Sequence, residues 1–296
     1  MAYAEVLTTD AALAGRQRQR ATRSWWLLLS PSLLLMAAFF LLPLVFVVWL
    51  TATDGAGFLG NIGWYLSDPV QRAVLVRTFT AAGLVTLSCA VVGYGYAYLM
   101  ASASPRARMV LTIIVLMPFW TSLMVRTFAW VILLQDNGLV NNALAAAGLG
   151  RWSLIRTTAG VVIGMAQILL PLMVMPIYAT MTRIDRGLLS ASATLGARPA
   201  TTFLRIWLPL SLPGVGAGSL LVFISSLGFY VTPALLGSPD SSLISQQIFA
   251  QVSGLLEWGR GGAMGLSLLV ITGALLAAAA GTLAAWRSVR RSRGLS

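Results

Sequence analysis

Two residue types on which much enzyme and transport chemistry depends, lysine and histidine, do not occur in the 296-residue sequence, whose basic residues are all arginine. A Walker A loop uses a lysine to hold nucleotide phosphates. Schiff-base catalysis also needs lysine, and most triads and zinc sites need histidine. The chain therefore cannot hydrolyse ATP through a P-loop of its own, and we expect no catalytic residue, no cofactor and no metal ion. A partner must power any uphill work that it does.

Few other reactive groups remain. Cys89 is the single cysteine, and because it falls in an apolar block we interpret it as a small packing residue. Arg126 is the one charged residue inside such a block. A charge within a membrane span is costly and by default indicates function. Arg126 could belong to an outer gate or path, or its long stem could carry the charge to the membrane interface.

The elements that must position these residues are long apolar blocks. The sequence is 58% hydrophobic and 9% charged, whereas soluble domains carry about 25% charged residues. A bilayer core about 30 Å thick needs about 20 apolar residues per helix. The blocks lie near 25–52, 78–101, 109–134, 159–181, 214–236 and 262–286. Pro43, Pro118, Pro171 and Pro233 are predicted to kink these helices rather than end them.

We therefore predict an all-α polytopic membrane protein with six transmembrane helices over 25–286, preceded by a tail (1–24) and followed by a basic tail (287–296). One group of arginines flanks the spans on one side, at 16, 18, 20, 23, 106, 108, 183, 186, 198, 205, 287, 290, 291 and 293. A smaller group lies on the other side, at 72, 77, 151, 156 and 260. The positive-inside rule then places both termini in the cytoplasm.

The formal net charge of +12 follows mostly from this topology. The arginines flank spans and do not form one basic face with stacking aromatics, so we expect anionic membrane lipids, and no nucleic acid, as partners.

The predicted cytoplasmic segment 182–213 is longer than the 2 to 8 residues that usually link neighbouring helices. Asp185 suits the cap of a first helix, Gly196 its end, and Pro199 the first turn of a second helix. We therefore expect a helix, a sharp bend and a helix. Phe203, Ile206 and Trp207 would share one face of the second helix. That helix could rest on the membrane surface, or the whole segment could be a docking surface for an external motor.

The spacing of this segment resembles the EAA loop of permease subunits in binding-protein-dependent ABC importers. That loop reads E-A-A, three residues, G, nine residues, I, one residue, L-P. The matching residues are Ser190, Ala191, Ser192, Gly196, Ile206, Leu208 and Pro209. Stretches at 125–142, 169–185 and 228–237 are similar to the spermidine/putrescine type of permease. Ser190 stands where the family commonly has a glutamate.

The resemblance implies a non-catalytic permease subunit that moves a small organic solute inward, with a polyamine such as spermidine or putrescine as the expected solute. It implies an ATPase subunit dimer, a second, paralogous permease subunit and a periplasmic or lipid-anchored solute-binding protein as partners. The ATPase-docking residues would be Asp185, Ser190, Ala191, Ser192, Gly196, Arg198, Arg205, Ile206, Leu208 and Pro209.

The translocation path offers fewer signals, because no acidic residue lies within a predicted span. Ammonium groups can also be held by aromatic faces. Trp120, Phe229 and Tyr230 are therefore candidates for a path or gate together with Arg126, although each aromatic could be an ordinary packing residue or interface anchor.

Two other classes of protein compete with the ABC permease. A gradient-driven secondary transporter or channel is the main alternative, although such proteins usually place ionisable residues near mid-membrane. An intramembrane enzyme would need an acid–base set that the sequence does not supply.

Overall fold

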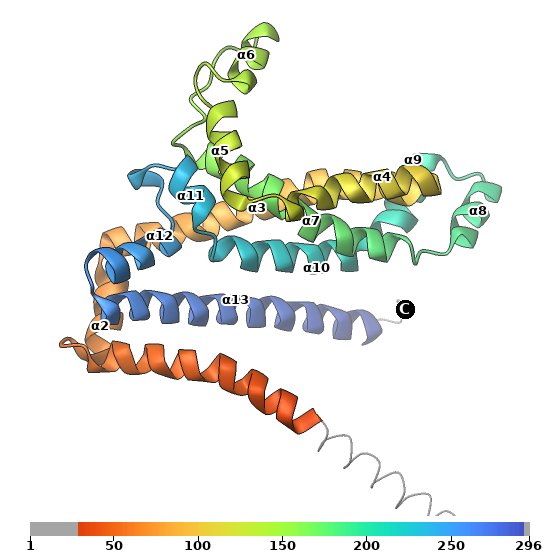
Figure 1. Ribbon diagram of the computed structural model, residues 1–296. Coiled ribbons are helices and arrows are strands. Elements are labelled where there is room, and N and C mark those ends of the chain that lie inside the picture. The colour runs from red at the N-terminus through yellow and green to blue at the C-terminus, as the bar shows by residue number, and fades with distance from the viewer. Residues whose placement is uncertain (1–28, 293–296) are drawn as a thin grey trace, which may run out of the picture.

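The computed structural model describes residues 29–292, except for the side chains of Arg186 and of 283–292, and every regular element in this range is a helix (Figure 1). The predicted tail 1–24 and the last four residues of the basic tail 287–296 lie outside the described residues. Within residues 29–292, five helices are long and apolar enough to cross a membrane, and a bent pair makes up to six. The five are Leu29–Thr53, α3 (Pro69–Ser102), α7 (Thr158–Met181), the continuous run Pro199–Leu227, and α13 (Trp258–Ser292), which is apolar enough as far as Thr282.

Shorter helices join the long ones. They are α2 (Gly57–Ser67), α6 (Leu139–Ala146), α8 (Arg186–Thr194), α11 (Val231–Leu236), α12 (Ile244–Phe249), the 3-10 turn η3 (Pro239–Ser241) and the π turn η4 (Ala250–Gly254). α2, α11 and α12 lie at one end of the long helices, and α8 lies at the other (Figure 1). The start of the first described helix and the last turns of α13 lie at the same end of the long helices as α8 (Figure 1).

The prediction that Pro118 only kinks a continuous helix over 109–134 is wrong, because the helix ends there. The chain forms α4 (Pro105–Leu116), the 3-10 turn η1 (Met117–Trp120) and α5 (Leu123–Leu133), and the two parts meet at 101°. Pro118 lacks an amide hydrogen for a helical ladder, and Thr121 and Ser122 then take up extended or near-extended conformations. Hydropathy misses this break because both halves are apolar.

The predicted bounds of the second and fifth spans are also wrong. α3 begins nine residues before position 78, because Asp68 caps it, accepting from the Val70 N–H at 2.8 Å. The fifth helix extends from α9 (Pro199–Thr202) through the π turn η2 (Phe203–Trp207) into α10 (Leu208–Leu227), and Pro213 lies inside it. The chain leaves this helix at Gly228, before 236.

The core of the molecule surrounds α7, the most buried of the spans. Its side chains Met173, Val174 and Ile177 are completely buried against α3 and α10. Gly214 of α10 allows close approach, since a Cβ there would lie 2.7 Å from the Pro176 carbonyl oxygen and 2.9 Å from the Ile177 Cα. Small residues commonly bring membrane helices together in this way.

We expect Gly214→Val to destabilise the protein in detergent, by about 1–3 kcal/mol, because the new side chain meets the α7 backbone and cannot be relieved by a rotamer change. Gly216→Val is the matched control, since nothing lies within 4 Å of a Cβ there. Thermal unfolding followed by size-exclusion chromatography measures both variants. Equal melting temperatures for the two would contradict the close packing of α7 against α10.

Candidate functional site

The segment that links α7 to α10 forms a helical hairpin at one end of the bundle (Figure 1). Asp185 caps α8, since its Oδ1 accepts from the Gly187 N–H at 2.8 Å. Pro199 occupies the first turn of α9. The predicted helix, bend and helix are present, although the second helix runs directly into the membrane span and is not a separate surface helix.

The bend between the helices depends on Gly196. Its φ is +77°, in the left-handed region, while no atom lies within 4 Å of a Cβ built there. The Gly196 N–H donates to the Ala193 carbonyl and the Ala197 N–H to the Ser192 carbonyl, both at 3.0 Å. This pair of bonds is a Schellman motif, which satisfies the last carbonyls of α8. Glycine is therefore needed here for backbone conformation rather than for space.

Ser192 joins the two helices of the hairpin. It is 8% exposed, and its Oγ lies 2.8 Å from the Leu189 carbonyl oxygen and 2.9 Å from the Thr202 Oγ1. Ser192 is one of the two positions at which the sequence departs from the alanine or glutamate of the EAA pattern. The hydroxyl that replaces a methyl group here hydrogen-bonds α8 to α9.

Aromatic rings fix the hairpin to α3. Phe203 packs edge to face on Tyr94 at 6.0 Å and on Tyr98 at 5.5 Å between ring centroids. Tyr98 makes the same kind of contact with Trp207, at 5.5 Å. We call these four rings the aromatic ladder. Next to it, the Tyr94 hydroxyl lies 2.9 Å from the Ser211 Oγ of α10. Phe203 and Trp207 bound the π turn η2, a rare geometry that is often found at functional sites.

A hollow of about 530 Å³ lies between the hairpin and the end of α3. Ser190 and Ala193 of α8 line it, as do Tyr98, Phe203 and Trp207 of the ladder. Of the other predicted docking residues, Asp185, Ala191, Arg198 and Arg205 are exposed on the hairpin, and Ile206 is half-buried. Leu208 and Pro209 lie in the first turn of α10, where Leu208 is half-buried and Pro209 is exposed. Sequence reasoning missed Tyr98 and Thr202, because only the fold brings them to the hairpin.

The four predicted path residues do not form one cluster. Trp120 is 78% exposed at the bend after α4, and Arg126 lies on α5, where its Nη2 donates to the Thr121 carbonyl at 3.4 Å. Tyr230 stacks on Phe249 at 5.0 Å, and Phe229 packs on the main core. Among the described residues, no hydrogen bond or ring contact joins these four side chains.

The elements that carry two of these residues do meet. Thr127 of α5 and Thr232 of α11 are completely buried, and their hydroxyl oxygens lie 3.2 Å apart. This bond holds the bent helix α5 against the segment that follows Tyr230. It was not predicted, since single threonines in apolar blocks carry no distinctive sequence signal.

Comparison with known proteins gives concordant results. Residues 93–288 match the family model described as "Binding-protein-dependent transport system inner membrane component". The chain is similar to the spermidine/putrescine transport system permease protein PotB of Salmonella typhimurium, with 34% identity over 76% of the chain and 77% of the relative. The PotB protein of Haemophilus influenzae is 30% identical over 86% of the chain and 88% of the relative.

A solved structure shares the fold. A chain of a bacterial alginate ABC transporter, crystallised with an alginate-bound periplasmic protein, superposes with a TM-score of 0.68 over 86% of this chain and 92% of that chain. The two sequences are 19% identical, so this likeness concerns the fold alone.

We expect Phe203→Leu to loosen the hairpin, because it removes two ring contacts worth about 0.5–1.5 kcal/mol each. Hydrogen exchange measured by mass spectrometry should become several-fold faster over 186–207 and stay unchanged in α7. Leu204→Ala is the control, since Leu204 is 59% exposed on the adjacent position. Unchanged exchange in Phe203→Leu would show that the ladder does not hold the hairpin.

Proposed function

The chain belongs to the family of binding-protein-dependent transport system inner membrane components, and from this premise we propose that α8, the Gly196 turn and α9 dock the ATPase that powers import of a polyamine. The chain is a non-catalytic, multi-pass permease subunit of a bacterial ABC importer in the inner membrane. Membership of this family implies an ATPase and a periplasmic binding protein as partners. Because the chain belongs to this family, we set aside the alternative of a gradient-driven secondary transporter or channel.

The geometry of the hairpin carries the docking proposal. It projects beyond the long helices at one end of the molecule, where a partner can reach it (Figure 1). Arg183, Arg198 and Arg205 are exposed in the segment between α7 and α10, so this end carries the excess positive charge expected of the cytoplasmic side. We therefore place this end, and with it both termini, in the cytoplasm, and assign to the hairpin the residues that the EAA spacing selects.

Ser190 changes the character of the docking surface. A glutamate at this position could form a charge-assisted hydrogen bond with a basic group of the ATPase, whereas a serine hydroxyl cannot supply the charge. The exposed residues of the hairpin instead offer arginine side chains and the apolar residues Leu188 and Leu195, which are 47% and 86% exposed. Docking here would rest on shape, apolar contact and arginine. The partner would be an ATPase dimer that this chain shares with a second, paralogous permease subunit.

The polyamine proposal rests on the printed function of the relatives that are 30–34% identical. A path without acidic residues in the described spans would bind a cation only weakly and briefly, so selectivity would reside mainly in the binding protein. Aromatic faces such as that of Tyr230 would supply the weak contacts.

We expect Gly196→Val to abolish docking, since a β-branched residue at φ +77° is strained and would open the turn. The amount of ATPase that co-purifies with the permease in detergent should fall at least several-fold, and uptake should be lost. Gly148→Val is a matched control because Gly148 has the same φ and free surroundings, and lies away from α8. Normal ATPase recovery with both variants would sink the assignment of the hairpin.

The substrate is tested through the binding protein of the same transporter. We expect calorimetric titration with spermidine or putrescine to give a dissociation constant on the order of 1 μM or below, and cells with the intact transporter to accumulate labelled polyamine. No binding of either polyamine, together with tight binding of a chemically different solute, would overturn this part of the proposal and leave the ATPase docking untouched.

A further inference from the structure

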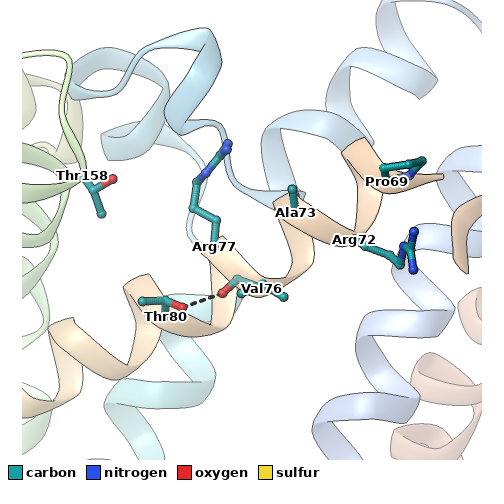
Figure 2. Close-up of a pocket in the computed structure, with 7 residues that line it drawn as sticks. All are labelled: Pro69, Arg72, Ala73, Val76, Arg77, Thr80 and Thr158. Carbon is teal, nitrogen blue, oxygen red and sulfur yellow. Dashed lines mark hydrogen bonds between the residues drawn. The ribbon is translucent and has the colours of Figure 1, made fainter. Parts of the chain in front are cut away.

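The first turns of α3 border a hollow of about 550 Å³ at the end of the bundle opposite α8 (Figures 1 and 2). Its lining residues are Pro69, Arg72, Ala73, Val76, Arg77 and Thr80 of α3, and Thr158 at the start of α7. Figure 2 shows the two arginine side chains leaving the helix in different directions, with Ala73 between them. The hollow is open, and a guanidinium group borders it on two sides.

The electrostatic character of this hollow is positive. The Arg77 Nη1 donates to the Ser242 carbonyl at 3.3 Å, and within the described part of the chain neither Arg72 nor Arg77 has an ion-pair partner. Thr158 is the first residue of α7, a helix of 24 residues, so the positive end of a helix dipole also faces this region. No acidic side chain lines the hollow. Its chemistry fits a carboxylate or a phosphate.

The position of Arg72 along α3 favours a soluble partner over a lipid. α3 has 34 residues and is therefore about 50 Å long, well beyond the roughly 30 Å hydrocarbon core. The apolar stretch of α3 begins at Thr78. Along the helix axis, Arg72 lies about 9 Å outside that residue. The headgroup layer on each face is only about 5–8 Å thick. Arg72, which is exposed, thus reaches the water above the lipid phosphates.

We propose that this hollow is the docking point for an acidic side chain of the solute-binding protein, whose carboxylate sits between Arg72 and Arg77. The proposal rests on the orientation given under the proposed function, which puts this end outside the cytoplasm. Guanidinium groups match carboxylates in bidentate geometry. Complementary charge of this kind sets the register of docking and speeds association. Its contribution to affinity is smaller. Among the residues that the structure describes, no acidic side chain lines this hollow.

The test uses the whole transporter in nanodiscs and the purified binding protein of the same transporter. We expect Arg72→Gln combined with Arg77→Gln to weaken binding about tenfold at 50 mM NaCl, and to remove most of the loss of affinity that the unmodified complex shows at 300 mM NaCl. Arg151→Gln is the control, because Arg151 is an exposed arginine outside the hollow that bonds only to the Asn137 Oδ1. Equal affinity for the double variant and the control would overturn the proposal.

A second measurement does not depend on removing arginine. Ala73→p-benzoylphenylalanine puts a photoreactive group inside the hollow, and we expect light to cross-link the permease to the binding protein. Cross-links to lipid alone would identify a headgroup phosphate as the occupant and overturn the proposal. The proposal would also be overturned if the double variant lost thermal stability only in nanodiscs that contain anionic phosphatidylglycerol. ATPase recovery and basal ATP hydrolysis should be unchanged in the double variant, so a failure here is distinct from a failure of ATPase docking at α8.

Discussion

The close packing of α7 against α3 and α10 is the constraint on which the other parts of the molecule depend. In a bilayer, apolar side chains gain little by leaving lipid for protein, so helices associate through dense packing and occasional hydrogen bonds. α7 meets this requirement with glycines of both neighbours: its Met173 lies against Gly93 of α3 and Gly218 of α10, and its Pro176 and Ile177 lie against Gly214 of α10. The three helices then form a compact unit to which both functional ends are attached.

Each end of this unit uses the same three helices differently. At the α8 end, α3 supplies Tyr94 and Tyr98, α10 supplies Ser211, and the hairpin from α7 closes on them through Phe203 and Trp207. At the other end, the first residues of α3 and α7 diverge enough to leave a hollow. The proposed ATPase and binding-protein contacts are therefore built on opposite ends of the same packed helices.

The sequence predicted the local features of this arrangement well. The span 159–181 agrees with α7 to within one residue, and Asp185, Gly196 and Pro199 occupy the cap, bend and first-turn positions assigned to them. These features depend on short-range chemistry, such as a side-chain cap or a glycine at positive φ. The kink predicted at Pro118 understated the bend in the third apolar block, because hydropathy averages over both arms and does not show that the helix ends.

Features made by distant residues could not be predicted in this way. The aromatic ladder joins positions more than 100 residues apart, and nothing in the sequence around Tyr98 distinguishes it from any other interfacial tyrosine. The hydrogen bond between Ser192 and Thr202 connects residues whose pairing depends on the angle of the turn.

The uninterrupted helix from Pro199 to Leu227 has a mechanical consequence. Its 29 residues make a rod about 43 Å long, with the hairpin at one tip and the α11 segment, bonded to α5, at the other. If such a rod pivots about its Gly214 contact near mid-length, a tilt of about 10° displaces each tip by roughly 4 Å in opposite senses. Movement of the hairpin is thereby converted into a lateral movement of the opposite end of the helix. The size of that movement depends on the position of Gly214 along the helix.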